Sequence, residues 1–178
     1  MKTLSIKART ALVAIIVIAC VGCDQATKYI AVEKIKPAGR IEVAGPLFAF
    51  QYAENEGAFL SLGATMSKPA RFWIFTVFTS FVLVALAYYV FMGAGLLLPD
   101  IVAIALLLAG GIGNMIDRVA NNGIVVDFMV MEVWGPIRTG VFNIADVAVM
   151  AGVFLMLGSR FFIRHGHHGD TTHDAPHA

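Results

Sequence analysis

Two aspartates, Asp127 and Asp146, are the residues of this sequence best suited to chemistry. Each stands beside a segment with the composition of a membrane-spanning helix, where an unpaired carboxylate costs roughly 2.5–3.5 kcal/mol at the helix centre. Ionisable residues at such depth are functional candidates by default. Two carboxylates held close together share a proton, so that one can act as a base and the other as an acid. We therefore expect Asp127 and Asp146 to meet and to work as a catalytic pair.

Other polar residues are spaced so that they share helical faces. Asp24 and Lys28 are four residues apart with the acid first, which is the favourable order for an ion pair on a helix. This pair is equally consistent with a structural ion pair and with a substrate contact. Asn114 and Arg118 are also four residues apart, and we expect them to bind backbone carbonyls of a substrate.

Asn143 lies three residues before Asp146, so the two side chains share a face and Asn143 is placed to orient the carboxylate. The alternative is that Asn143 is a helix N-cap. Asp117 points away from the face of Asn114 and Arg118 by about 60–100°. We interpret Asp117 as a structural or interfacial residue.

The composition indicates a single-domain polytopic membrane protein. The chain has 178 residues, of which 58% are hydrophobic and 14% charged, and its mean hydropathy is +0.78. The net charge of +1 gives no reason to expect nucleic acid as a partner. Cys20 and Cys23 form neither a disulfide framework nor a four-ligand metal set, so we expect no metal and no other cofactor.

Four apolar segments are candidate membrane spans, since each approaches or exceeds the roughly 20 residues that a crossing requires. They are residues 11–32, 72–92, 99–118 and 141–163. Residues 1–164 form the predicted membrane domain, and residues 165–178 a disordered, histidine-rich cytoplasmic tail. Pro99 and Asp100 suit the first turn of a helix, which explains Asp100 without assigning it to a site.

The two longer connections contain strand-like runs. Residues 40–43 alternate polar and apolar, and residues 47–53, after the turn signal Gly45-Pro46, are rich in Phe and Tyr. Residues 124–133 in the other connection are also strand-like. These runs predict a small sheet lying on one face of the membrane.

Four spans place both termini on one side, and the polar residues then gather on the other side. Those residues are Asp24, Gln25, Lys28, Asn55, Asn114, Asp117, Arg118, Asp127, Asn143 and Asp146. Unrelated structural polar residues would scatter over both sides. The count of basic residues, five on the side of the termini against eight opposite, does not set the orientation. Because the first span usually dominates and three basic residues precede it, we expect both termini in the cytoplasm.

Five segments in this order carry a family resemblance. They are Asp24-Gln25-Ala26-Thr27-Lys28, Asn55-Glu56-Gly57-Ala58-Phe59, Gly110 to Arg118, Val125-Val126-Asp127-Phe128 and Phe142-Asn143-Ile144-Ala145-Asp146. Together they resemble the sequence blocks of the lipoprotein signal peptidases, the type II signal peptidases of bacteria. The likeness covers nearly the whole chain except the histidine-rich tail.

This resemblance implies an inner-membrane aspartic endopeptidase. Such an enzyme removes the signal peptide from diacylglyceryl-modified prolipoproteins and cuts just before the lipid-modified cysteine. The implied fold is an all-α membrane protein of four transmembrane helices, with a small extracytoplasmic β-sheet and a second extracytoplasmic loop over the site. The implied partners are the prolipoprotein and membrane lipid, and we expect a monomer.

By motif, Asp127 and Asp146 match the catalytic pair of that family, at the extracytoplasmic face. The positions that match site-shaping or substrate-binding residues are Asp24, Lys28, Asn55, Gly57, Asn114, Arg118 and Asn143.

Three other interpretations remain open from the sequence. A proton-coupled transporter or small channel would use the two aspartates as a relay, but a pathway needs polar partners through the whole bilayer. A structural membrane subunit would leave the embedded polar residues unexplained. A lipoprotein, cleaved before an acylated Cys23, would account for Gly22-Cys23 after a basic and apolar start.

Overall fold

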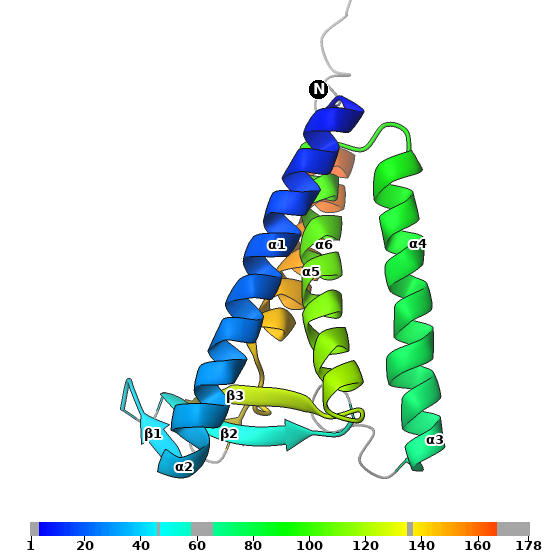
Figure 1. Ribbon diagram of the computed structural model, residues 1–178. Coiled ribbons are helices and arrows are strands. Elements are labelled where there is room, and N and C mark those ends of the chain that lie inside the picture. The colour runs from blue at the N-terminus through cyan, green and yellow to red at the C-terminus, as the bar shows by residue number, and fades with distance from the viewer. Residues whose placement is uncertain (1–3, 46, 58–65, 135–136, 167–178) are drawn as a thin grey trace, which may run out of the picture.

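The computed structural model describes residues 4–45, 47–57, 66–134 and 137–166. Within them, long helical segments run alongside one another, and a small sheet lies across the end of the helices away from the N-terminus (Figure 1). Helix α5 packs most extensively against α6 and α1 and less against α4, which stands apart from the others over much of its length.

The first helix is longer than the sequence predicts. Helix α1, Ile6–Ile30, continues through the π-helical segment η1, Ala31–Ile35, and the short α2, Lys36–Ala38. The prediction that this span begins at residue 11 and that a connection starts at Glu33 is therefore wrong at both ends. Arg9, predicted as a flanking charge, lies inside α1 and is buried, with 8% of its surface exposed.

The second helix comprises α3, Lys68–Arg71, the π-helical η3, Phe72–Phe78, and α4, Thr79–Met92. It therefore begins before the predicted Phe72, where the Ser67 hydroxyl accepts a hydrogen bond from the Ala70 N–H at 3.4 Å. Such a side chain satisfies a backbone donor that has no partner inside the helix.

The third and fourth long helices are α5, Leu98–Ala120, and α6, Ile144–Gly166. Asp100 in the first turn of α5 accepts the Leu97 N–H at 3.2 Å, which confirms its predicted place at a helix start. Helix α6 begins after the predicted residue 141 because Phe142 pairs with Met129 of the sheet. The predicted boundary at residue 164 falls inside α6, and residues 167–178 of the predicted tail lie outside the described part of the chain.

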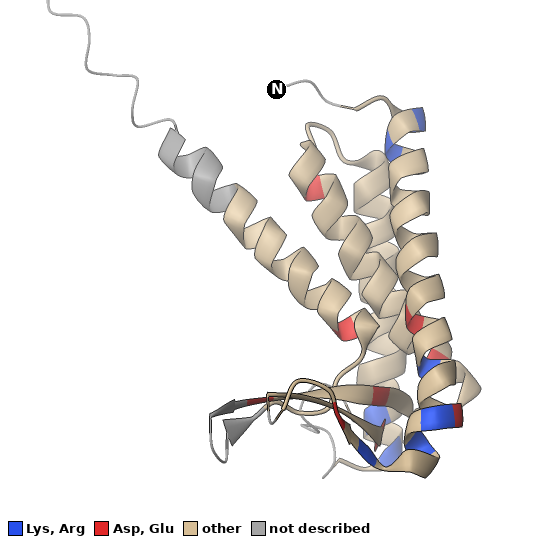
Figure 2. Cartoon of the chain, turned by 90° about the vertical axis from the view of Figure 1, so that its left-hand side faces the viewer, with Lys and Arg blue, Asp and Glu red and all other residues tan. Residues whose placement is uncertain are grey.

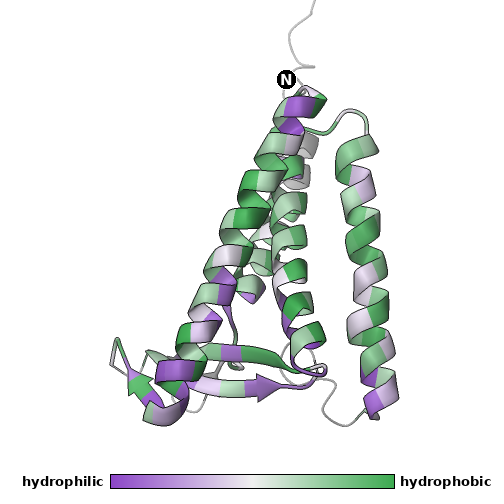
Figure 3. Ribbon diagram, viewed as in Figure 1, coloured by the Kyte–Doolittle hydropathy of each residue, from purple (hydrophilic) through white to green (hydrophobic). Residues whose placement is uncertain are grey.

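Three of the helical segments are long and apolar enough to cross a membrane: Ile6–Ala38, Lys68–Met92 and Leu98–Ala120. Apolar residues dominate the middle of these helices, and polar residues concentrate at their ends and in the sheet (Figure 3). In the part of the chain that the structure describes, the apolar part of α6 is Ile144–Ser159, which is shorter than these three segments. The chain is a multi-pass membrane protein, and the fourth span stays a prediction.

The strands form an antiparallel sheet in the order β1, Arg40–Glu42, β2, Phe48–Asn55, β3, Val125–Trp134, and the two-residue β4, Ile137–Arg138. All three predicted strand-like runs are strands, because their alternating or β-branched and aromatic residues suit a half-buried sheet. Asp127 lies on β3, within the run 124–133 that the sequence predicts to be strand-like. A bulge in β2 between Phe50 and Ala53 shifts the register directly beside Asp127, which pairs with Ala53.

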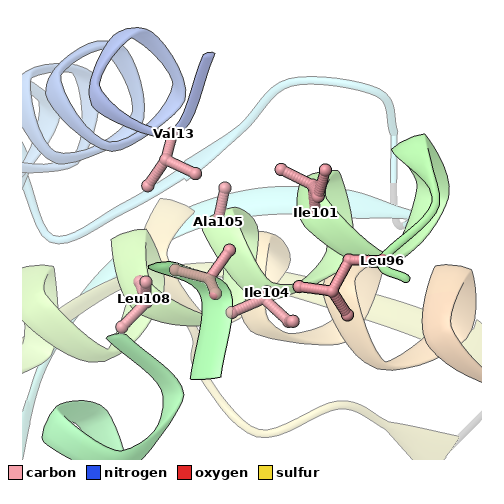
Figure 4. Packing of buried hydrophobic residues seen from close by; sticks show 7 residues of the cluster. Val13, Leu96, Ile101, Ile104, Ala105 and Leu108 are labelled. Atoms are coloured by element: carbon pink, nitrogen blue, oxygen red, sulfur yellow. The ribbon is translucent and has the colours of Figure 1, made fainter. Parts of the chain in front are cut away.

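Two apolar clusters hold these elements together. One lies between the helices at the end nearer the N-terminus and includes Val13, Ile101, Ile104 and Leu108 (Figure 4). The other joins the sheet to the extended first helix, with Ala31, Ile35, Val126, Phe128 and Met129 buried. The second cluster fixes β3 against the helix that carries Asp24 and Lys28.

Candidate active site

Asp127 is buried on β3, with 1% of its surface exposed. Asn55 on the neighbouring strand β2 pairs with Val125 and therefore projects on the same side of the sheet as Asp127. The Asn55 side-chain amide donates to Asp127 Oδ2 at 2.9 Å. The backbone N–H of the buried Gly57 donates to Asn55 Oδ1 at 3.0 Å, so the Asn55 amide group is turned toward the carboxylate.

Asp146 occupies the first turn of α6, where Asn143 is the N-cap. The side-chain oxygen of Asn143 accepts the Asp146 N–H at 2.9 Å, and Asp146 Oδ2 accepts the Asn143 N–H at 3.2 Å. This reciprocal pattern is a capping box with an aspartate in the position usually held by glutamate or glutamine. The N-cap interpretation of Asn143 is therefore confirmed.

Asn143 also reaches the other aspartate. Its side-chain amide donates to Asp127 Oδ1 at 2.6 Å and lies within 3.3 Å of the Val126 carbonyl oxygen. The side chain is fully buried. One asparagine thus hydrogen-bonds to both carboxylates: it donates to Asp127 with its side-chain amide and to Asp146 with its backbone N–H.

Asn114 on α5 supports Asp146 rather than pointing to an open site. Its amide donates to Asp146 Oδ1 at 2.9 Å, and its Oδ1 accepts from Asn143 at 3.0 Å and from Lys28 Nζ at 3.1 Å. Both ends of the Asn114 carboxamide are paired within the protein, and its binding to a substrate carbonyl stays a prediction.

Lys28 lies at the centre of a buried ionic cluster. Its ammonium group is 2.8 Å from Asp24 Oδ2 and 2.9 Å from Asp117 Oδ2, and at most 5% of each of these three side chains is exposed. The predicted ion pair of Asp24 and Lys28 is present. Asp24 also accepts the Ala145 N–H at 2.9 Å with Oδ1, so it caps the start of α6 as well.

The carboxyl group of Asp127 has a raised pKa. Burial raises the pKa of Asp127 to about 7, and the neighbouring negative charge of Asp146 adds to this effect, while hydrogen bonds from Asn55 and Asn143 oppose it. A carboxyl group with a pKa near neutrality is present in both protonation states at physiological pH, as acid–base catalysis requires.

Arg118 lines a cavity of about 610 Å³ at the end of α5. Its guanidinium lies 5.9 Å from the centre of the Phe75 ring and interacts electrostatically with Asp146, Asp117 and Asp127. The cavity combines basic groups with apolar and aromatic surface. Its lining residues are Glu56, Lys68, Arg71, Phe72, Phe75, Thr76, Arg118, Val119, Asn122, Gly123 and Ile124.

Every predicted site residue thus lies at one end of the helices, beside the sheet, where Lys, Arg, Asp and Glu are concentrated (Figure 2). The opposite end holds Arg9 and Asp100, which bond to helix ends. Among the residues that the structure describes, no three His, Cys, Asp or Glu side chains are grouped to hold a metal ion.

The sequence placed Asp117 and Gln25 at this end of the helices but gave neither a partner. Asp117 binds Lys28, and Gln25 donates to Asp117 Oδ1 at 2.9 Å and to the Gly113 carbonyl oxygen at 3.2 Å. These contacts join α1 to α5, so they could not be inferred from the face of α5 alone.

Comparison with known proteins agrees with this description. A family model described as signal peptidase (SPase) II matches residues 16–162. A lipoprotein signal peptidase of Sphingopyxis alaskensis is 35% identical over 136 residues, covering 75% of this chain and 76% of that protein. A lipoprotein signal peptidase of Listeria monocytogenes is 34% identical over 143 residues, covering 80% of this chain and 88% of its own.

Two solved structures, each described as a bacterial membrane enzyme, share the fold. One has a TM-score of 0.75 at 30% identity and covers 94% of this chain and 95% of its own; the other has 0.73 at 33% identity and covers 84% and 92%. The fold and the cluster of polar groups at one end of the helices define a multi-pass membrane enzyme. The chain belongs to the signal peptidase II family.

Proposed function

We propose that this enzyme is an aspartic endopeptidase that removes the signal peptide from diacylglyceryl-modified prolipoproteins, cutting just before the lipid-modified cysteine. Membership of the signal peptidase II family and the relatives named lipoprotein signal peptidase support this function. The main support for the site assignment is that Asn143 donates hydrogen bonds to both Asp127 and Asp146.

In the proposed mechanism the two aspartates share one proton. The ionised carboxylate takes a proton from a water molecule, and the resulting hydroxide attacks the scissile carbonyl carbon. The protonated carboxyl donates its proton to the carbonyl oxygen, which gives a gem-diol. The C–N bond then breaks as the leaving amine receives a proton, and the dyad returns to its starting state. The raised pKa of Asp127, about 7, supports proton sharing at neutral pH.

The supporting residues have separate roles in this proposal. Asn55, held by Gly57, and Asn143 orient Asp127, while Asn114 orients Asp146. Arg118 is the proposed substrate-binding group. It lines the cavity, and among the residues that the structure describes no hydrogen-bond partner of its side chain is found. A guanidinium there can bind carbonyl oxygens of an extended peptide whose own helix has unwound near the membrane surface.

The direct test uses purified Asp127→Asn and Asp146→Asn with a diacylglyceryl-modified prolipoprotein. We expect both variants to fold and to bind substrate, and cleavage to fall to the background rate. Cleavage at the wild-type rate by either folded variant would refute its catalytic role. Arg118→Gln separates binding from chemistry, since we expect mainly a higher KM.

We also propose that four spans place both termini in the cytoplasm and the site at the extracytoplasmic face of the bacterial inner membrane, with a monomer in contact with lipid. In this topology the connection between α5 and α6, which contains β3 and β4, covers the site. A Cys20→Ser, Cys23→Ser background allows single cysteines to be labelled in intact cells. We expect an impermeant reagent to label Asn122→Cys, which is at the sheet end, and to spare Ala94→Cys, which is at the other. The reverse labelling would overturn the orientation.

A further inference from the structure

Asp117 accepts the backbone N–H of Val126, the residue that precedes Asp127, at 3.0 Å. The same Oδ2 atom binds Lys28 at 2.9 Å, and Oδ1 accepts from Gln25 at 2.9 Å. The carboxylate therefore accepts from three donors on two different elements, α1 and β3.

The backbone of Val126 is held on both sides of its Cα atom. Its N–H, in the Val125–Val126 peptide, binds Asp117, and its carbonyl oxygen, in the Val126–Asp127 peptide, lies 3.3 Å from the Asn143 amide. Because Val126 directly precedes Asp127, holding both of its backbone polar groups fixes where the Asp127 Cα and side chain begin. Val126 itself is buried in the cluster that joins the sheet to the first helix.

Lys28 connects this support to the other aspartate. Its ammonium group has three donors, and the three partners are Asp24, Asp117 and the Asn114 side-chain oxygen. The last contact leaves the Asn114 amide to donate to Asp146. One buried lysine therefore joins the group that holds the Asp127 backbone to the group that orients the Asp146 carboxylate.

We propose that Asp117, held by Lys28 and Gln25, is a positioning residue for Asp127: it fixes the backbone N–H of Val126 and so helps to set the place of the Asp127 carboxylate relative to Asp146. This inference rests on the proposed function, in which those two aspartates are catalytic. Asp117 touches no reacting atom in this proposal. It acts through the backbone of β3, and its counterion Lys28 acts on Asp146 through Asn114.

A positioning role and a merely structural role predict different kinetics. Loss of a positioning group disturbs the transition state, so kcat falls while KM stays nearly constant. Supporting hydrogen bonds of this kind typically contribute about 10–100-fold where they orient ligands of a metal, and we expect an effect of that size here. Loss of a purely structural group lowers the melting temperature and the yield of folded enzyme, but the enzyme that does fold keeps its kcat.

The experiment measures kcat, KM and melting temperature of full-length Asp117→Asn in detergent with a diacylglyceryl-modified prolipoprotein. Asp117→Asn keeps the shape but removes the charge that holds Lys28. The matched control is Asp100→Asn, because Asp100 is a buried aspartate at the opposite end of the same helix. We expect Asp117→Asn to lose about 10–100-fold in kcat at unchanged KM, and Asp100→Asn to lose stability alone.

A gentler variant covers the case in which Asp117→Asn does not fold. Gln25→Met keeps the length of the side chain and removes its hydrogen bond to Asp117, and we expect a fall in kcat of about fivefold at unchanged KM, which corresponds to about 1 kcal/mol. Wild-type kcat in whichever of the two variants folds would overturn the positioning role. Asp127→Asn in the same assay separates the two proposals: if it still cleaves, the catalytic assignment fails, and if it is inactive while Asp117→Asn is normal, only the positioning role fails.

Discussion

Asn143 and Asp146 cap the start of α6 reciprocally, each accepting a backbone N–H of the other, at 2.9 and 3.2 Å. A capping box ordinarily serves only the helix. Here its carboxylate is the proposed catalytic group, and its asparagine donates to the second proposed catalytic group, Asp127, at 2.6 Å. The helix start therefore sets the geometry of the carboxylate pair, and the two roles of Asn143 can be separated by mutation.

Asn143→Ser separates capping from the contact with Asp127. Serine caps helices nearly as well as asparagine but has no amide that reaches Asp127. We expect Asn143→Ser to lose most of its activity with a small loss of stability. Asn143→Ala should lose activity and, in addition, about 1 kcal/mol of stability from the missing cap. Melting temperatures and kcat of both variants test this, and equal melting temperatures for the two would contradict the capping role.

Asp127 should make the stability of the protein depend on pH. The folded state raises the pKa of Asp127 from 3.8 to about 7, chiefly by burial, so between these values the folded state holds a proton that the unfolded state has released. Stability from this group is complete below about pH 4 and is lost as the pH rises to about 7. The difference is roughly 4 kcal/mol.

Thermal unfolding of wild type and Asp127→Asn between pH 4 and 8 measures this effect. Asp127→Asn lacks this one titrating group and keeps every other side chain, so the difference between the two proteins isolates Asp127. We expect the wild type to lose more stability than Asp127→Asn as the pH rises. Parallel pH profiles of the two proteins would mean that Asp127 has an ordinary pKa.

The sequence predicted the strands and most of the helical regions because burial leaves a periodic record in local composition. The alternation at residues 40–43 and the aromatic run at 47–53 are β1 and β2. The convergence of Asp127 and Asp146 on one end followed from counting spans. Neither inference needed knowledge of long-range contacts.

Other features depended on contacts that no local pattern records. Arg9 resembled an ordinary flanking charge, yet it is buried because its partners are carbonyl oxygens more than 80 residues away. The partners of Asp117 are on α1 and β3, and neither can be inferred from α5 alone. The helix beyond Glu33 was missed because its apolar residue Ile35 packs against the sheet and does not extend a lipid-facing apolar run.

Gly110 should be sensitive to the smallest enlargement. A Cβ atom at this position would collide with the Ala145 carbonyl oxygen and the Val149 side chain, both on α6. We expect Gly110→Ala to destabilise the protein by about 1–3 kcal/mol through overpacking, and to reduce kcat because it pushes away the turn that carries Asp146. Gly22→Ala is the control, since nothing lies within 4 Å of a Cβ there. It should be neutral or stabilise α1 by about 0.5–1 kcal/mol, and a similar loss in both variants would exclude close packing as the cause.

Arg9 should contribute to stability without contributing to catalysis. Its Nη1 group donates to the carbonyl oxygens of Val90, at 3.2 Å, and Gly93, at 2.9 Å, and so satisfies the end of α4. Arg9→Met leaves these acceptors without a charged donor, and hydrogen bonds to charged groups contribute about 1.5–3 kcal/mol. Lys7→Met, at an exposed position of the same helix, should change stability by no more than about 0.5 kcal/mol. Because Arg9 lies at the end of the helices away from the sheet, kcat of folded Arg9→Met should equal that of the wild type. A fall in kcat would show that the attachment of α4 at this end is coupled to the site at the other.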